Sequence, residues 1–420
     1  MFNTIRDIFK IQDLRRKILY TLMMLALVRL GSLIPSPLLN AEDIASSFNS
    51  AGDLLELFDI MSGSAFSQMN LFAMGIQPYI NASIIMSLLT VAIPRLEELQ
   101  KEGESGRKKI NQYTRYLTVI LALIQSFGIS FGLRSYFIGG LGTAWSVIFS
   151  MGIFTAGSMF VMWIGENITE KGVGNGISLI IMVNILSSVP SALSSLWSYD
   201  NYWMFAIIMV LILAIIVFIV VLELAERRIP IQYAKRMQGR KTYGGNTTYI
   251  PIRVNMAGVI PIIFASSLQS LPQLITAFFT TNPQGVWGTI LKWLSTSHPF
   301  GACLYVVLIV LFTYFYASIT FNPIEMAENL KKNGGFIPGY RPGKPTLDYL
   351  QKTSKYVTFI GAIALAVIAA IPVAMQFIFS IDRLVIGGSS LMICVGVALE
   401  TVKQVEGQMV MRHYKGFLTR

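Results

Sequence analysis

Apolar residues along this 420-residue chain gather into long runs instead of alternating with polar ones. Runs of about 20 apolar residues predict helices that can cross a hydrocarbon layer about 30 Å thick. Ten such runs are present, at residues 18–34, 75–93, 116–133, 145–165, 175–196, 203–224, 256–278, 302–321, 356–378 and 384–402. A further apolar segment at 53–64 is too short to cross. The pattern predicts an all-α polytopic membrane protein with ten transmembrane helices.

Composition supports this prediction. The hydrophobic fraction is 54% and the charged fraction is only 13%, whereas a soluble domain has about 25% charged residues. A water-soluble fold of this length could not hide so much apolar surface. The net charge of +11 would also suit a nucleic-acid-binding protein, so the positions of the basic residues have to decide its meaning.

The basic residues are distributed very unevenly between the two sides of the predicted membrane. An even number of spans places both ends of the chain on one side, and 29 of the 33 lysines and arginines fall on that side. Basic residues accumulate on the cytoplasmic side of membrane proteins. We therefore expect both termini and the long basic loops 225–255 and 322–355 to face the cytoplasm.

The ten spans divide into two sets of five. Residues 18–197 form the first half and residues 198–402 the second, followed by a cytoplasmic tail at 403–420. Because five is odd, the second half enters from the opposite side, and two similar halves would form an inverted repeat. Residues 1–17 are expected to hold a cytoplasmic amphipathic helix, since apolar residues recur at helical spacing in 2–11. The alternative is a frayed start to the first span.

Side chains that could carry catalysis or bind a metal are scarce. The two histidines, His298 and His413, lie on opposite sides of the membrane, which excludes a zinc site of the HExxH type. The glycine-rich run 172–176 follows a span, where a nucleotide-binding loop would follow a strand. Cys303 and Cys394 sit in apolar runs. We therefore expect neither an enzyme nor a bound cofactor, and the absence of a mid-membrane carboxylate disfavours a secondary small-solute transporter, which is the alternative function.

The two long basic loops have their own structural signals. Loop 225–255 contains two stretches of alternating residues, at 229–233 and 250–254, which predict a hairpin-like finger whose strands are kept short by prolines. Loop 322–355 alternates proline and glycine around Arg341, which predicts a stiff, irregular turn. Ordered loops of this kind usually serve function. The alternative is that both are solvated linkers whose charge only sets the orientation.

Six strings of residues resemble one known family. They are GIQPYINASII at 75–85, EGESGRKKINQYTRY at 102–116, TEKGVGNGIS at 169–178, ERRIPIQYAKR at 226–236, NMAGVIPIIFASS at 255–267 and GFIPGYRPG at 335–343. In this order they are similar to the SecY/Sec61-alpha family of protein-conducting channels. The resemblance extends from the first span to about residue 377 and is weakest in the outward loops and the last span.

The resemblance implies two inverted five-helix halves around an hourglass pore that passes unfolded secretory proteins. It also implies a sideways opening that releases hydrophobic segments into lipid. The waist of the pore would be an aliphatic ring formed by Ile80, Ile84, Ile181, Ile185, Ile263 and Ile393. A short re-entrant plug helix at about 53–64 would close the outer funnel with Leu54, Leu55, Leu57, Phe58, Ile60, Met61, Ser62 and Gly63. Gln77 stands where the family usually has an apolar residue.

The resemblance further implies a lateral gate and a docking surface. Gln125 and Asn255 would help to hold the gate shut through interhelical hydrogen bonds, and an Asn255→Leu variant should export precursors with weakened signals more readily. The docking surface for the ribosome and the SecA motor would include Arg227, Arg228, Lys235, Arg236, Arg240 and Arg341. Implied partners are SecE-like and SecG-like small membrane subunits, signal peptides, unfolded preproteins and the lipid bilayer.

Overall fold

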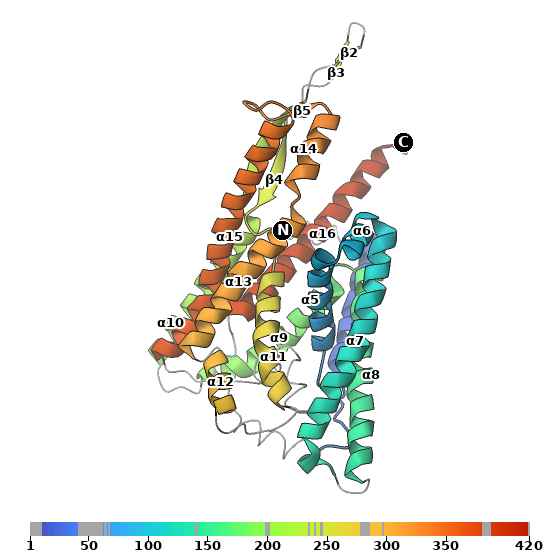
Figure 1. Ribbon diagram of the computed structural model, residues 1–420, viewed down its shortest axis with the longest axis vertical. Helices are drawn as coiled ribbons and strands as arrows, with labels where there is room; N and C mark the ends of the chain where they lie inside the picture. Colours follow the sequence, from blue (N-terminus) through green and yellow to red (C-terminus); the bar gives the residue numbers. More distant parts are fainter. Residues whose placement is uncertain are drawn as a thin grey trace.

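The computed structural model describes most of the chain, as a mainly helical protein (Figure 1). The described residues are 11–40, 62, 65, 68–138, 142–197, 202–233, 236–238, 241–243, 247–277, 286–295, 298–379 and 388–418. The predicted amphipathic helix at 2–11 lies outside them, apart from Ile11. So does the predicted plug, apart from Ser62, which is buried.

Each of the ten predicted apolar runs coincides with a separate helix. The first half contains α2 (Gln12–Gly31), α5 (Gln77–Ala92), α6 (Pro94–Lys101), α7 (Glu104–Gly132), the 3-10 turn η1 (Arg134–Tyr136), α8 (Thr143–Lys171) and α9 (Gly176–Trp197). The second half contains α10 (Tyr202–Leu224), α11 (Ile260–Ala277), α12 (Val286–Leu294), α13 (Pro299–Thr320), α14 (Pro323–Lys332), α15 (Lys344–Phe379) and α16 (Gly388–Leu418). Several helices run beyond the apolar stretch: α16 takes in most of the predicted tail.

Length and apolar composition qualify some of these helices as membrane spans. Among the described residues five pass, namely Glu104–Gly132, Thr143–Lys171, Phe205–Leu224, Pro299–Lys332 and Lys344–Ile371. The α5–α6 pair would be a sixth, although it bends by 99°. The bend falls at Ile93, which is held in an extended conformation by Pro94 after it. The count of ten spans stays a prediction.

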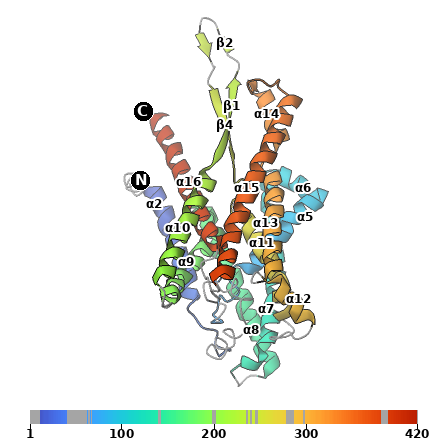
Figure 2. The ribbon, with the colours of Figure 1, turned by 90° about the vertical axis from the view of Figure 1, so that its left-hand side faces the viewer.

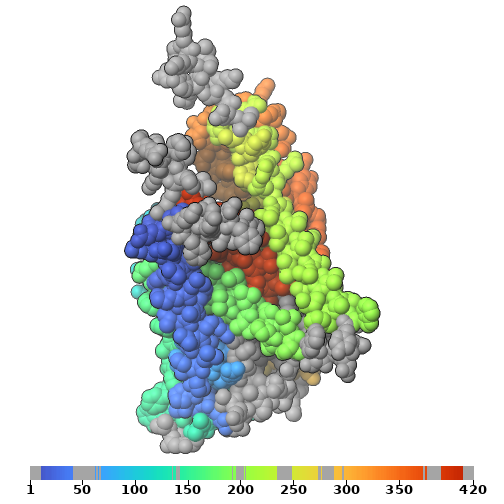
Figure 3. Space-filling model, turned by 180° about the vertical axis from the view of Figure 1, so that it is seen from behind, coloured from blue at the N-terminus to red at the C-terminus, as the bar shows by residue number. Residues whose placement is uncertain are grey.

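The helices of the two halves pack side by side around one shared core. In Figure 1 the helices α5 to α8 lie on one side and α10, α13 and α15 on the other, with α9, α11 and α16 between them. Figure 3 shows the opposite face, where α2 lies beside α9 and α16 is seen behind α10. The largest apolar cluster draws residues from both halves, from α2 and α5 through to α16. The core therefore depends on both halves being present.

A tight turn joins α8 to α9 and sets the direction of α9. Gly174 has φ +84°, a backbone conformation that glycine adopts without strain. The hydroxyl of Thr169 accepts a hydrogen bond from the Gly176 amide at 2.9 Å, and the Asn175 side chain accepts one from the Ile177 amide at 3.1 Å. The glycine-rich run is thus a helix–helix turn with a capped helix start, as expected for a segment that follows a span.

A small antiparallel sheet rises beyond the helices (Figure 2). Strand β1 (Glu226–Tyr233) pairs with β4 (Thr247–Arg253), with Ile229 opposite Ile250, and β2 (Arg236–Gln238) pairs with β3 (Lys241–Tyr243) further along the same hairpin. The predicted finger is confirmed, but its strands are not short. The prolines are tolerated because β4 is an edge strand and because Pro230 lies where β1 pairs with β4 alone.

Candidate functional site

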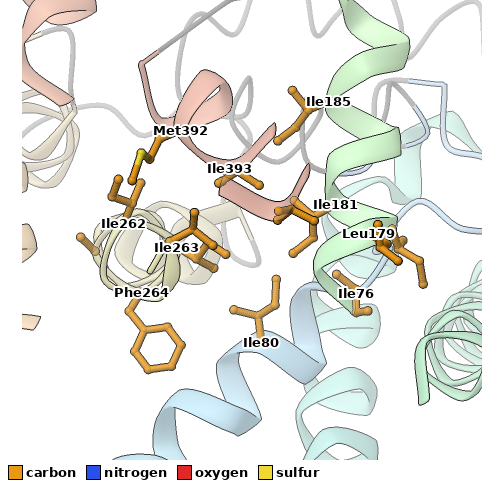
Figure 4. Packing of buried hydrophobic residues seen from close by; sticks show 14 of the residues in the cluster. Ile76, Ile80, Leu179, Ile181, Ile185, Ile262, Ile263, Phe264, Met392 and Ile393 are labelled. Carbon is orange, nitrogen blue, oxygen red and sulfur yellow. The ribbon is translucent and has the colours of Figure 1, made fainter. Parts of the chain in front are cut away.

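Six isoleucines from four helices meet in the shared core. Their side chains are between 1% exposed, at Ile181, and 7% exposed, at Ile263. Figure 4 shows the side chains from α5, α9, α11 and α16 gathered in one region, while Phe264 points to another side of α11. The full set is Ile80, Ile84, Ile181, Ile185, Ile263 and Ile393, which all belong to one cluster. The structure therefore places every residue of the predicted ring in the same buried core, and their lining of a pore stays a prediction.

The local sequence explains how these side chains converge. On α5 and on α9 the two isoleucines stand four residues apart, so each pair faces one direction. Isoleucine is branched at Cβ and has one strongly preferred side-chain rotamer in a helix. The cluster is consequently a stiff surface of methyl and methylene groups, without a donor or acceptor of its own.

The seam between the halves carries polar contacts on both sides of the α5 isoleucines. The Gln77 amide on α5 donates to the Ser267 hydroxyl on α11, with 3.4 Å between Nε2 and Oγ. Ten residues further along α5, the Ser87 hydroxyl lies 3.4 Å from the Tyr316 hydroxyl on α13. Phe264 adds an edge-on contact to the Tyr316 ring, with centroids 5.1 Å apart. Sequence reasoning missed these pairs, although a glutamine inside an apolar run was their signal.

The two polar residues predicted at the gate have different places. Gln125 is buried on α7. Asn255 precedes α11, and its Nδ2 donates to a Glu223 carboxylate oxygen at 2.6 Å and to the Gly258 carbonyl at 3.1 Å. The bond to Glu223 is interhelical, as expected, but it joins α10 to α11 within the second half. A role for Asn255 at the gate stays a prediction, since both of its hydrogen-bond partners lie within the second half.

Glu223 also connects the base of the finger to α16. Its backbone carbonyl accepts a hydrogen bond from the Lys403 ammonium at 3.2 Å, and the amide of Val254 donates to the Ala225 carbonyl at 2.9 Å where the hairpin closes. The end of α10, the residues before α11 and the later part of α16 are thus joined at one point, directly beneath the sheet.

The two long basic loops form one packed unit, which we call the sheet module (residues 226–233, 247–253 and 322–357). Strand β5 (Gly335–Phe336) adds to β1 at Gln232 and Tyr233, and α14 packs along α15. One apolar core holds these pieces together, built from Ile229, Ile231, Ile250, Ile252, Ala327, Leu330, Ile337, Leu350 and Val357. The second loop is therefore more regular than expected, since a helix and a strand precede the turn.

The turn that carries Arg341 is held from several sides. The Thr346 hydroxyl donates to the Arg341 carbonyl at 2.8 Å, and the rings of Tyr340 and Tyr349 lie 4.3 Å apart. Gly339 has φ +88°, a conformation that other residues rarely adopt. The Arg341 side chain is exposed. The predicted stiff turn is confirmed, and it presents its arginine to solvent.

The other predicted docking residues are spread along the finger. Arg227 and Arg228 are exposed at the base of β1, where Arg228 forms an ion pair with Glu226 at 2.6 Å. Arg236 lies on β2. Lys235 and Arg240 lie outside the described residues. The burial alternates along β1, so the isoleucines face the module core while the intervening residues face solvent.

An ion pair joins α7 to the last part of α8. The Arg115 side chain donates to a Glu166 carboxylate oxygen at 2.7 Å. Within the described part of the chain, no group of three histidine, cysteine or acidic side chains is arranged to hold a metal ion.

A protein-family model described as SecY matches residues 70–402. The chain belongs to the SecY family. Protein translocase subunits SecY from Halalkalibacterium halodurans and Bacillus subtilis are each 44% identical to it over 435 residues, covering 100% of both chains. The SecY of Streptomyces coelicolor is 45% identical over 430 residues, with 98% of each chain covered.

Solved structures show the same fold at much lower identity. A structure described as a protein-conducting channel has a TM-score of 0.63 and 18% identity, and the match covers 94% of this chain and 92% of that one. Sec61 in a canine ribosome–channel complex matches with a TM-score of 0.63, 17% identity and the same coverage. The SecY fold thus accounts for 94% of the chain.

Proposed function

We propose that this chain is the channel subunit of a protein translocase in the bacterial cytoplasmic membrane. It would pass unfolded secretory proteins across the membrane and release hydrophobic segments sideways into lipid. Ten spans in two inverted halves, both termini in the cytoplasm and a plug at 53–64 belong to this proposal. The observation that carries it is the apolar isoleucine cluster, to which both halves of a chain of the SecY family contribute; we assign this cluster as the waist of the pore.

The waist suits a channel for chains of any sequence. An aliphatic constriction resists wetting, so ions leak poorly while the channel is idle. Because its side chains offer no hydrogen bond, a passing polypeptide gains no preferred register against them. A solute transporter, in contrast, needs polar groups that recognise its substrate, and these six isoleucines provide none.

The seam between α5 and the pair α11 and α13 would act as the lateral gate. The contacts Gln77–Ser267 and Ser87–Tyr316 are weak enough to part when a hydrophobic segment enters, since hydrogen bonds between membrane helices contribute about 0.6 kcal/mol on average. Gln125 and the Asn255–Glu223 pair would set the positions of the helices on either side.

The sheet module would face the cytoplasm and be the docking surface for a motor ATPase or a ribosome. Its apolar core supports Arg341 and the finger arginines as a rigid basic surface, which suits both ribosomal RNA and an acidic protein surface. Sec61 and Ssh1 have both been solved with ribosomes. The chain itself would need this partner for energy, together with SecE-like and SecG-like small subunits.

Crosslinking tests the pore assignment directly. A photoreactive residue at Ile84 should crosslink to a secretory precursor stalled in the channel. The matched control is Ile85, the next residue on α5, which is 37% exposed and should label lipid instead. The proposal would be contradicted if a confirmed stalled complex gave no crosslink from position 84. It would also be contradicted if positions 84 and 85 gave equal crosslinks.

A further inference from the structure

Helix α12 and the start of α13 carry an apolar surface that the channel mechanism does not use. Ile290 and Trp293, three residues apart on α12, are 41% and 54% exposed, and Phe300 at the start of α13 is 54% exposed. Leu291, on the opposite side of α12, is only 2% exposed. Helix α12 thus has two apolar faces, one packed on the protein and one open.

The open face is held in a defined shape. The Trp293 ring stacks on the His298 ring, with centroids 5.4 Å apart and planes inclined by 12°, and its centroid is 6.2 Å from that of Phe300. Gly301 lies directly against the Ser295 carbonyl, which closes the turn between the two helices. The aromatic residues therefore form a fixed surface at the end of the bundle away from the sheet (Figure 1).

This surface continues a stripe along α13. Phe300, Val307, Leu311 and Tyr314 are all exposed, and their spacing of seven, four and three residues places them on one side of the helix. A stripe of this kind on a membrane-crossing helix is suited to lipid. The open face of α12 extends it past the helix end, to the depth at which tryptophan and tyrosine concentrate in membrane proteins.

We propose that α12 is an interfacial anchor whose open face lies in the headgroup layer of the outer leaflet, with the lipid surface as its partner. The proposal rests on the membrane topology given above. Lys292 is also exposed, and the turn of about 100° per residue directs it away from the open face, where a lysine can extend into water while its stem covers apolar surface. Trp293 and Phe300 then occupy the layer where amphipathic rings are most stable.

The anchor is tied to the gate helix through Gln269 of α11. This buried side chain donates from Nε2 to the Leu294 carbonyl at 2.8 Å, where α12 ends, and to the Gly301 carbonyl at 2.9 Å, where α13 begins. Helix α11 also carries Ser267 of the gate seam, so movement of α11 at the seam would also move α12. Anchoring of α12 in the outer leaflet would therefore restrict the opening of the gate.

Environment-sensitive labels test the lipid contact. In full-length chain lacking Cys303 and Cys394, purified with its native assembly and placed in phospholipid vesicles, a fluorophore on Ile290→Cys or Trp293→Cys should be quenched severalfold more by nitroxide lipids than by aqueous iodide. A label on Lys292→Cys should show the reverse preference. Iodide quenching at position 290 would overturn the proposal, and protection from both quenchers would show that protein covers this face.

A second experiment tests the hydrogen bonds that join Gln269 of α11 to the ends of α12 and α13. Gln269→Leu should leave lipid quenching at position 290 unchanged while export of a precursor with a weakened signal rises severalfold. Unchanged export would remove the link to the gate. Translocation of an intact precursor by the labelled vesicles is measured in parallel, so a failed anchor with normal translocation leaves the channel function standing.

Discussion

Isoleucine builds both the shared core of the two halves in this SecY-family chain and the core of its sheet module, with different consequences. In the shared core, isoleucines four residues apart on helices form an apolar surface to which both halves contribute. In the module, isoleucines two residues apart on strands form the inside of a small sheet whose other side displays arginine. The comparison teaches that isoleucine packs helices together at one spacing and supports an exposed basic surface at another; under the proposed function the first set also lines the pore.

The largest expected effect lies at the tip of the module. Arg341→Glu reverses a charge held by a stiff turn, and disrupting one partner of a close charge pair at an interface costs about 2–5 kcal/mol. Motor-driven export into vesicles should therefore fall by about 30-fold or more, with the protein still inserted. Lys344→Glu, three residues away and also exposed, is the control and should have a small effect. Normal export by the Arg341→Glu variant would contradict the assignment of the module as a docking surface.

A polar substitution in the proposed pore waist should increase the leakage of ions through the idle channel. Ile181→Ser places a hydroxyl in the apolar constriction, so the idle channel should wet and conduct ions by about 10-fold more. Ile181→Val keeps the surface apolar and serves as the control. Chloride efflux from vesicles measures the leak. An idle channel that stays tight with serine at this position argues that the cluster is only a packing core.

Between the two regions lies the Asn255–Glu223 bond. Asn255→Leu removes the donor of a hydrogen bond to a carboxylate, which contributes about 1.5–3 kcal/mol. Export of precursors with weakened signals should rise by about 10-fold because the start of α11 loosens.

A double-mutant cycle assigns that effect to the bond. Glu223→Leu should raise export as Asn255→Leu does, and the double variant should add little to either. Fully additive effects would mean that Asn255 acts at the gate without Glu223.

The smallest expected effect lies at the seam. Gln77→Leu and Tyr316→Phe each remove one contact between the halves, worth about 0.6 kcal/mol, so each should raise export of weakened signals by about threefold. The assay is the same as for Asn255, which allows a direct ranking. An effect from Gln77→Leu as large as that of Asn255→Leu would place the gate latch at the seam and not at the base of the finger.

Most of the secondary structure was open to prediction because its signals are local. Runs of apolar residues located ten helices, alternation at 229–233 and 250–254 located the hairpin, and glycine with proline located the turn around Arg341. The strand lengths were underestimated, because a proline blocks pairing on one side only. Helices α6, α12 and α14 were missed. Helices α6 and α14 are short and lie in charged loops, whereas α12 is apolar but, at nine residues, too short to be recognised as a span.

The candidate site was predictable only in part. The spacing of Ile80 with Ile84 showed that they share a face, but the resemblance to a family was needed to say that the face is inward. No pattern linked Gln77 to Ser267, which follows 190 residues later.

The sequence by itself determined which segments are helices, which side the charges favour and which residues share a face, because helix period, strand period and charge asymmetry are written within single segments. Only the tertiary structure decided that Asn255 binds Glu223, that two basic loops form one module and that Gln269 ties α12 to α11. These contacts depend on how separate helices pack against one another, and packing is decided by shape and burial across the whole chain.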